Sequence, residues 1–259
     1  MRFIQKAVLA LFASAGIAGP ALAVPIIFTG SGTGPGPVPV TASATFDIVG
    51  NNLTVTLTNT SPSNSGQDVP GSTLSGVFWD FTGNPVLTPV SATIPAGSSI
   101  IQSALCAPGP CAGVTNVAGE WGYQATSFPG SADRGIASSG YLSTGLPGNI
   151  GNFNNGAAGT DLDGPASLNG INFGIVSAAP GFNPNGGLAR PLIQDTVVFL
   201  LSGVSGLSNS DISHVSFQYG TEITELNVPG RPPQSLPEPG TVALLGMALV
   251  SLAYFRRAK

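Results

Sequence analysis

Residues 52–59 read NLTVTLTN, and this stretch decides the fold class of the chain. Leu53, Val55 and Leu57 alternate with threonines, a period of two that is typical of a strand with one buried face and one exposed face. A similar run, residues 44–49, precedes residues 53–59, and the sequence Gly-Asn-Asn at residues 50–52 between these two runs favours a tight turn. The pattern therefore predicts a β-hairpin near the start of the folded body.

Further strand patterns follow along the chain, separated by turns rich in glycine, proline and asparagine. Residues 195–201, DTVVFLL, form a continuous apolar run, which predicts a strand buried on both faces. Residues 211–219 alternate, so one face should be apolar and the other, with His214, Ser216 and Gln218, should be polar. Shorter strands are expected at residues 74–81, 85–94, 120–125 and 169–176.

Glycine and proline mark the regions without a clear strand pattern. We expect residues 29–40, TGSGTGPGPVPV, to be irregular or extended, and residues 128–191 to be mostly loop. No segment of the body shows a capped pattern with a 3.6-residue period. The chain is therefore predicted to be all-β, with a single β-sandwich or jelly-roll-like domain, residues 24–226, that has long Gly/Asn/Pro-rich loops. A Pro-rich linker, residues 227–235, is expected to follow.

The N-terminus, residues 1–23, has the three parts of a secretory signal peptide. A basic start precedes an apolar stretch, residues 7–18, that is too short for a comfortable membrane span. Ala21 and Ala23 are the small residues that signal peptidase reads, so cleavage is expected just before Val24. We therefore expect export by the general secretion machinery.

The body between the two terminal segments carries very little charge. It has no lysine, and its three arginines, Arg134, Arg190 and Arg231, stand against eleven acidic residues, which leaves it eight charges negative. Charged residues make up 8% of the whole chain, against about 25% in ordinary globular proteins. Because nucleic-acid binding needs a basic footprint, this composition excludes nucleic acid as a partner.

Cys106 and Cys111 are the only cysteines, in the sequence CAPGPC. Export would place them in an oxidising compartment, and the Pro-Gly-Pro turn can bring the two sulfurs together. A disulfide loop is predicted, with two free thiols as the alternative. A metal site or a redox pair is poorly supported, because the single histidine is about a hundred residues away and the Cys-x-x-Cys spacing is absent.

The C-terminal stretch, residues 236–259, reads LPEPGTVALLGMALVSLAYFRRAK and has three parts. The first is a rigid, exposed motif that contains Pro237, Glu238, Pro239 and Gly240. The second, residues 241–255, is an uncharged apolar run predicted to be a helix roughly 24 Å long, against ~30 Å for a bilayer core. The third is a basic stop, expected on the cytoplasmic side, made of Arg256, Arg257 and Lys259.

This order of motif, apolar helix and basic end resembles the PEP-CTERM sorting signal of Gram-negative bacterial surface proteins. In that family a membrane-embedded transpeptidase, the exosortase, recognises the signal and processes the protein near the motif, and Pro237, Glu238 and Pro239 occupy the signature positions. The resemblance implies a transient inner-membrane anchor, followed by release to the cell surface or extracellular matrix in association with exopolysaccharide and biofilm. A permanent anchor is one alternative. A sortase signal is another, although Pro239 stands where sortase needs threonine.

The body also resembles a recurring ectodomain of PEP-CTERM surface proteins. The similarity rests on residues 52–59, on GIASSG at residues 135–140 and on VSFQYGT at residues 215–221. It implies an exosortase-dependent surface protein of unassigned molecular activity, and it supplies no catalytic residues.

Motifs for catalysis are mostly absent from the sequence. It contains no Gly-x-Ser-x-Gly elbow, His-Glu-x-x-His pair, Walker loop or Rossmann glycine pattern. His214 is the only histidine, and its place on a polar strand face predicts a solvated surface residue. A carboxylate pair for glycoside hydrolysis would have to come from Asp80, Glu120, Glu222 and Glu225, whose separations the sequence does not define. We therefore expect neither enzymatic activity nor a cofactor, and polysaccharide hydrolysis is the remote alternative.

Two binding functions are further alternatives. A carbohydrate-binding module would use Trp79, Trp121 or Tyr123 as a platform for sugars, although strand patterns favour the core for both tryptophans. A weak calcium candidate contains Asp161 and Asp163, because calcium prefers oxygen ligands from a flexible Asp/Asn/Gly loop. The EF-hand pattern is broken there by a proline and lacks its closing glutamate, so an ordinary Asx-rich turn is the other reading of this loop.

Overall fold

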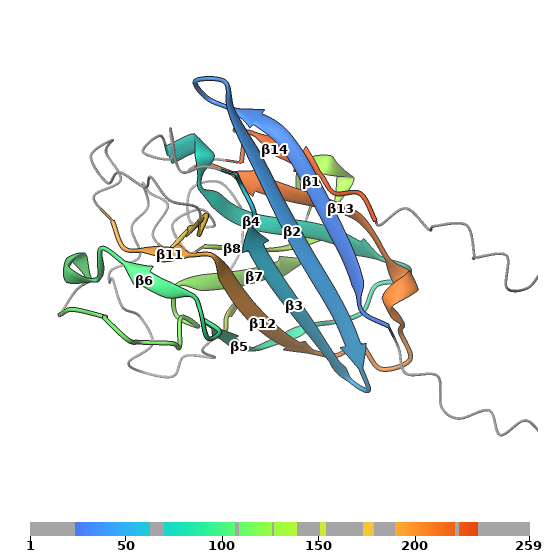
Figure 1. Ribbon diagram of the computed structural model, residues 1–259. Coiled ribbons are helices and arrows are strands. Elements are labelled where there is room, and N and C mark those ends of the chain that lie inside the picture. Colours follow the sequence, from blue (N-terminus) through green and yellow to red (C-terminus); the bar gives the residue numbers. More distant parts are fainter. Residues whose placement is uncertain are drawn as a thin grey trace, which may run out of the picture.

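The computed structural model describes residues 24–62, 70–106, 109–125, 127–138, 151–153, 173–178, 190–220 and 223–232. Within these ranges the protein is all-β, as predicted, because strands supply nearly all of the regular structure and helix is limited to 3₁₀ turns of three residues. The strands form two curled sheets, which Figure 1 shows from the side of β2 and β3.

The first sheet, sheet A, is built around the hairpin predicted from the sequence. Across the sheet its strands are β1 (Ile26–Gly34), β2 (Val38–Val49), β3 (Asn52–Asn59), β12 (Thr196–Ser202) and β5 (Thr88–Thr93). Every neighbouring pair is antiparallel. Between β2 and β3, Gly50 has a φ of +62°, which glycine adopts without the steric penalty that other residues meet. The alternation in β3 is also confirmed, since its leucines and valine are buried and its threonines are half-buried on the outer face.

The second sheet, sheet B, contains the remaining strands. Its main path runs through β6 (Ser99–Ile101), β11 (Leu192–Gln194), β10 (Ile175–Val176), β4 (Leu74–Phe81), β8 (Arg134–Ser138), β7 (Trp121–Ala125) and β9 (Gly151–Asn152). In addition, β13 (Ile212–Tyr219) pairs with β4, and β14 (Asn227–Pro229) pairs with β13. Of the strand pairs in the described ranges, β10 and β11 are parallel and the others are antiparallel.

The two sheets are connected at Asp195, where the chain passes from β11 in sheet B directly into β12 in sheet A. Asp195 has a φ of +84°, a region in which aspartate is enriched relative to most other residues with a side chain. Its N–H donates to the Val176 carbonyl at 2.8 Å, and its carbonyl accepts from the Asn59 N–H at 3.0 Å. One residue therefore belongs to the hydrogen-bond networks of both sheets.

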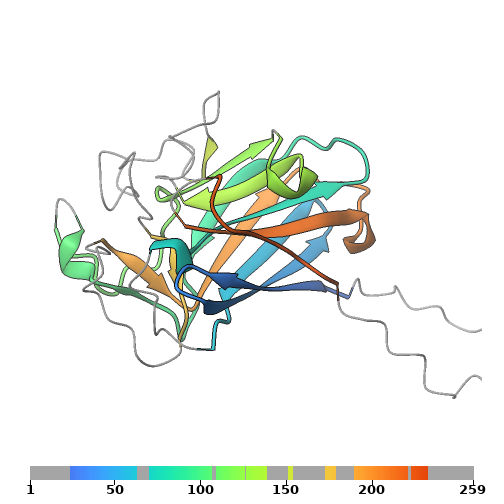
Figure 2. The ribbon, with the colours of Figure 1, turned by 90° about the horizontal axis from the view of Figure 1, so that it is seen from above.

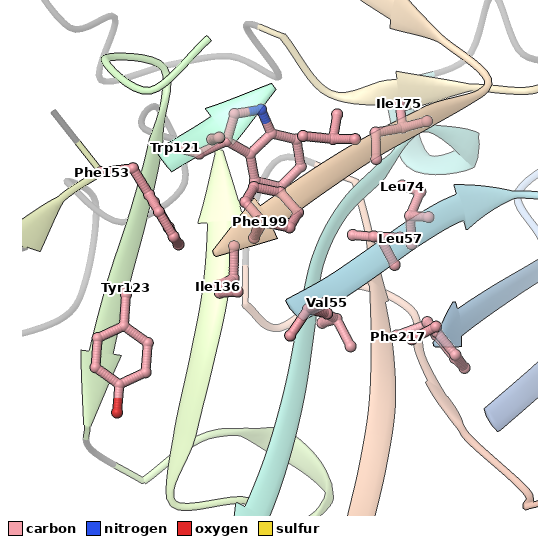
Figure 3. Packing of buried hydrophobic residues seen from close by; sticks show 14 of the residues in the cluster. Val55, Leu57, Leu74, Trp121, Tyr123, Ile136, Phe153, Ile175, Phe199 and Phe217 are labelled. Carbon is pink, nitrogen blue, oxygen red and sulfur yellow. The ribbon is translucent and has the colours of Figure 1, made fainter. Parts of the chain in front are cut away.

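Buried side chains from both sheets form one main hydrophobic core. Figure 3 shows Trp121 of β7 close to Phe199 of β12, and their ring centroids are 5.0 Å apart. Phe153 contacts the same Phe199 ring at 5.3 Å, and Phe46 of β2 contacts Trp79 of β4 at 5.5 Å. Aromatic pairs in such geometry contribute about 0.5–1.5 kcal/mol beyond the burial of their area, so these contacts help to hold the two sheets together.

The first and last described strands meet at one edge of the molecule. The Thr29 N–H donates to the Arg231 carbonyl at 2.9 Å, and the Arg231 N–H donates to the Thr29 carbonyl at 2.8 Å. Because β14 also pairs with β13, this contact joins sheet B to the β1 edge of sheet A. Figure 2 shows β14 passing from β13 towards β1.

Strands β1 and β14 occupy glycine- and proline-rich sequence. Of residues 29–40, expected to be irregular or extended, residues 29–34 and 38–40 are extended and paired in β1 and in the start of β2, and residues 35–37 form the turn between them. Glycine favours this arrangement because the inner face of β1 lies directly against β13 and β14. Residues 227–229, assigned to the linker from their composition, form β14, and the folded body continues to Arg231.

Three strands differ from what the sequence patterns predict, two in their burial and one in its presence. The prediction that β12 is buried on both faces is wrong, because Val198 and Leu200 are only half-buried on the outer face of sheet A. The prediction of a polar, open face on β13 is wrong for Ser216 and Gln218, which are buried. A 3₁₀ turn, η3 (Pro129–Ser131), covers this face, and Ser216 Oγ donates to the Pro129 carbonyl at 3.3 Å. Strand β8, in turn, lies in sequence expected to be mostly loop.

Several predicted segments lie outside the described residues. They are the signal peptide with Ala21 and Ala23, the calcium loop with Asp161 and Asp163, the motif Pro237, Glu238, Pro239 and Gly240, the helix at residues 241–255, and the basic stop Arg256, Arg257 and Lys259. Val24, the expected first residue of the mature chain, is described and is 80% exposed. In the ranges that the structure covers, no helix is long and apolar enough to cross a membrane.

Candidate functional site

A network of charged side chains begins where Asp80 of β4 meets His214 of β13. His214 Nδ1 lies 2.7 Å from Asp80 Oδ2. The contact depends on a β-bulge, because Ser213 pairs with Asp80 and Ser216 pairs with Phe78, which leaves one extra residue in β13. At the bulge His214 has a φ of +47°, and its side chain is 63% exposed. The local irregularity therefore turns the imidazole outwards while Asp80 holds it.

Asp80 connects this pair to a buried arginine. Its Oδ1 accepts a hydrogen bond from the backbone N–H of Asp133, whose carboxylate binds the guanidinium of Arg134. Arg134 Nε and Nη2 donate to Asp133 Oδ1 and Oδ2 at 2.6 and 2.9 Å. The guanidinium also donates to the Pro85 carbonyl at 3.1 Å and to Asn84 Oδ1 at 3.3 Å. Arg134 is fully buried, and these four bonds compensate for the loss of its hydration.

Hydrogen bonding and burial set the protonation states in this network. The hydrogen bond from Arg134 holds the pKa of Asp133 below its usual value, against the opposing effect of partial burial. Burial acts to lower the pKa of Arg134, but its bond to Asp133 and the neighbouring negative charges outweigh burial and raise it. Tyr123 of β7 is buried nearby, and burial raises its pKa to about 12. At neutral pH the network therefore contains a fixed ion pair beside a neutral phenol.

The chemistry open to this network is limited. Asp80 bound to Nδ1 orients the imidazole of His214, as a carboxylate does in general acid–base pairs, and the ring is exposed to solvent. Both cysteines are joined in a disulfide, so no thiolate nucleophile is available to it. Among the residues described, no group of three His, Cys, Asp or Glu could hold a metal ion. The contacts instead tie β4, β8 and β13 to the loop that follows β4, which is a structural role.

The aromatic residues considered for sugar binding are core residues. Trp79 and Trp121 have no exposed surface, and Tyr123 is 6% exposed. The ring centroids of Trp79 and Tyr123 are 6.2 Å apart, and Trp79 also contacts Phe46. Figure 3 shows Trp121 and Tyr123 on the same strand within the packed interior. None of these three rings offers a face on which a sugar could stack. The preference for the core inferred for both tryptophans is therefore confirmed.

The acidic residues considered for glycoside hydrolysis lie in different settings. Asp80 is engaged by His214 and by the Asp133 N–H, Glu120 is buried beside β7, and Glu225 is exposed before β14. Glu222 lies outside the described residues. The geometry therefore supplies no argument for a catalytic pair made of these carboxylates.

The predicted disulfide between Cys106 and Cys111 is present, with the two Cα atoms 5.8 Å apart. Both residues are buried, and the Cys111 N–H donates to the Ser103 carbonyl at 3.1 Å. The bridge therefore closes a small loop against η2 (Ser103–Leu105), between β6 and β7.

Two charged residues of structural importance were not singled out by the sequence patterns. They are Asp133 and Arg134, and their adjacency in a body with only three arginines is the signal that could have found them, because a buried arginine needs an acid close by. Comparison with known proteins adds no further candidate, since no protein-family model, curated protein or solved structure matches this chain. Function is therefore inferred from the sequence signals and from this geometry.

Proposed function

We propose that this protein is an exported surface or extracellular-matrix protein that an exosortase processes at its C-terminal Pro-Glu-Pro signal. Its body is a β-sandwich or jelly-roll-like ectodomain formed by the two sheets. The signal peptide directs it to the secretion machinery, and the C-terminal helix holds it transiently in the inner membrane of a Gram-negative bacterium. Processing then releases it to the cell surface or matrix, where extracellular polysaccharide is its expected surrounding. The observation that carries the proposal is the tripartite order of residues 236–259.

Each part of this tail has a separate role in the proposal. Pro237 and Pro239 keep Glu238 in an extended segment, where its backbone is accessible to attack by a transpeptidase. The apolar run of residues 241–255 sets the depth of the motif relative to the membrane. The basic end, residues 256–259, resists transfer across the membrane and fixes the orientation of the helix.

The edge formed by Thr29 and Arg231 is consistent with this arrangement. Because Arg231 is held in the sheet, only residues 232–236 separate the folded body from Pro237. Five residues span at most about 18 Å when fully extended. The folded body would therefore stay close to the membrane until the tail is removed. The Cys106–Cys111 disulfide agrees with an oxidising compartment outside the cytoplasm.

Processing in the native host tests the proposal. We expect Glu238→Ala, or deletion of residues 241–255, to prevent processing, because the first removes the charged residue of the motif and the second removes its membrane positioning. Gln234→Ala, in the same proline-rich stretch but outside the motif, is the matched control and should be processed like the parent chain. Immunoblots of membrane and extracellular fractions provide the measurement. Normal processing of both altered tails would rule out the assignment.

A further inference from the structure

A polar hollow lies at the β1 edge of sheet A, where sheet B joins it. It is lined by Thr29, Ser31, Thr41, Thr60, Pro229 and Arg231, together with the small residues Gly30 and Ala42. Its volume is about 290 Å³. This value is near the lower end of ligand sites in proteins, which begins at about 300 Å³, so the hollow suits one sugar-sized unit.

The backbone around this hollow is held in place. The backbone N–H of each of Arg231 and Thr29 donates to the carbonyl of the other, and the neighbouring Gly230 N–H donates to the Val215 carbonyl at 2.7 Å. The Thr60 N–H donates to the Thr41 carbonyl at 2.9 Å. The residues that line the hollow are thus anchored by main-chain bonds. A preformed site loses less conformational entropy on binding than a flexible one.

The side chains in the hollow favour a ligand with several hydroxyl groups. Thr29, Ser31 and Thr60 are exposed and Thr41 is half-buried, so their hydroxyls can contact a bound molecule. Each hydroxyl is both a donor and an acceptor, which matches the groups on a sugar ring. One bond is already made inside the hollow, from Thr60 Oγ1 to Thr41 Oγ1 at 3.0 Å, and it leaves the Thr41 hydrogen free to be donated.

The charge of the hollow adds a second requirement to the ligand. Arg231 is exposed, and its guanidinium forms no ion pair within the part of the chain that the structure describes. None of the described residues that line the hollow is acidic, although the body as a whole is strongly acidic. A guanidinium binds a carboxylate through two parallel hydrogen bonds. The preferred ligand therefore carries a carboxylate as well as hydroxyls.

The outer face of sheet A extends this polar surface away from the hollow. In the register of β1, β2 and β3, Thr29 lies opposite Ser43, and Ser43 lies opposite Thr58. These three hydroxyl residues form a row across strands spaced about 4.8 Å apart. Further units of a polymer bound at the hollow would meet hydroxyl groups along this row.

We infer that the hollow binds a carboxylate-bearing sugar unit of an acidic polysaccharide. Arg231 binds the carboxylate, Thr29, Ser31, Thr41 and Thr60 bind the ring hydroxyls, and the row through Ser43 and Thr58 contacts the adjoining units. The inference goes beyond the sorting proposal and does not rest on it, because binding at this edge requires no processing of the tail.

Titration calorimetry on the full chain in mild detergent tests this inference. The probes are a tetramer of galacturonic acid, the same tetramer with every carboxyl methyl-esterified, the galacturonic acid monomer and inorganic phosphate. We expect the acidic tetramer to bind more tightly than the monomer, and the neutral ester to bind at least tenfold more weakly than the acid. Equal binding of acid and ester, or no binding of the acidic tetramer at millimolar concentration, would overturn the inference. So would phosphate that competes as well as the monomer, because it would show a simple anion site.

Variants locate the binding on this edge. Arg231→Gln should weaken binding of the acidic tetramer at least tenfold, and Thr41→Val should weaken it several-fold, because each removes one of the proposed contacts at similar side-chain size. Thr54→Val is the matched control, since Thr54 is half-buried on the outer face of β3 but does not line the hollow. Unchanged circular dichroism of each variant excludes unfolding. If Thr54→Val weakens binding as much as Arg231→Gln does, the site is not at this edge.

Discussion

Gly30 of β1 lies so close to Phe217 of β13 that a Cβ added to this glycine would be 2.6 Å from the ring atom Cδ2. The same Cβ would lie 3.1 Å from Val228 Cγ1 of β14. Glycine at this position therefore allows the edge of sheet A to approach sheet B closely enough for Thr29 and Arg231 to pair. Arg231 and the polar hollow both lie at this edge, so its packing shapes the proposed binding site.

Replacement of Gly30 by alanine should destabilise the protein. The added methyl group must displace a fully buried phenyl ring, and overpacking of this kind costs about 1–3 kcal/mol. Gly109→Ala is the matched control, because no described residue beyond its chain neighbours comes within 4 Å of the Cβ position there, so it should change stability little. Urea unfolding of both variants provides the measurement. Equal stability of the two would show that the sheets do not approach each other as described.

Stability should fall in alkaline solution because of Tyr123. Burial raises the pKa of this phenol to about 12, whereas in the unfolded chain its pKa is about 10. The folded state therefore binds the proton more tightly than the unfolded state, and the resulting stabilisation is complete below pH ~10 and lost as the pH rises towards about 12. Burial also raises the pKa of Tyr219, which contributes in the same direction.

Urea unfolding at several alkaline pH values measures this effect. Because burial raises the pKa of Tyr123 from 10.0 to about 12, the loss of stability from this phenol is at most about 3 kcal/mol. Tyr123→Phe should reduce the dependence on pH without abolishing it, since Tyr219 remains. A Tyr123→Phe variant with the full alkaline loss would show that this phenol does not titrate as proposed.

His214 provides a test of backbone strain at the bulge. Both His214→Gly and His214→Ala remove the bond to Asp80, but alanine keeps a side chain at a φ of +47° and glycine does not. We expect the glycine variant to be the more stable of the two by about 1 kcal/mol, because a Cβ in the left-handed region is penalised. Thermal unfolding compares them directly, and an alanine variant of equal or greater stability would contradict the strained conformation.

The disulfide should contribute measurably to stability. Replacement of both Cys106 and Cys111 by serine removes the link that closes a short loop, and chain entropy alone predicts a loss of about 2 kcal/mol for a loop of this size. Thiol titration of the unreduced, unfolded protein should find no free thiol. Two reactive thiols, or an unchanged midpoint of unfolding in the double variant, would contradict a structural bridge.

Local sequence patterns predicted many of the strands, but they did not predict which faces of those strands are buried. In β3 one face packs against the core and the other does not, so the alternation of apolar residues and threonines in the sequence predicted its burial. The continuous apolar run of β12 predicts burial of both strand faces, yet Val198 and Leu200 are only half-buried among the residues that the structure describes. Conversely, Ser216 and Gln218 are buried because η3 and Asn227 pack over them. The contact between Ser216 and η3 joins residues 87 positions apart in sequence, and the periodicity of a single strand does not predict it.

The candidate sites also differ in whether their residues are contiguous in the sequence. The sorting motif is contiguous, so Pro237, Glu238 and Pro239 can be recognised without a fold. The Arg134 network and the hollow beside Arg231 are assembled from distant strands, and their residues are individually ordinary in the sequence. Their arrangement becomes visible only when the pairing of β4 with β8 and of β1 with β2 is known.

The intact mass of the protein recovered from its native host tests the central proposal most directly. We expect a chain that begins at Val24 and ends between Leu236 and Gly240, with or without a group attached at the new C-terminus. A mass that extends through Lys259 would mean that the tail is a permanent anchor, and it would contradict processing by an exosortase.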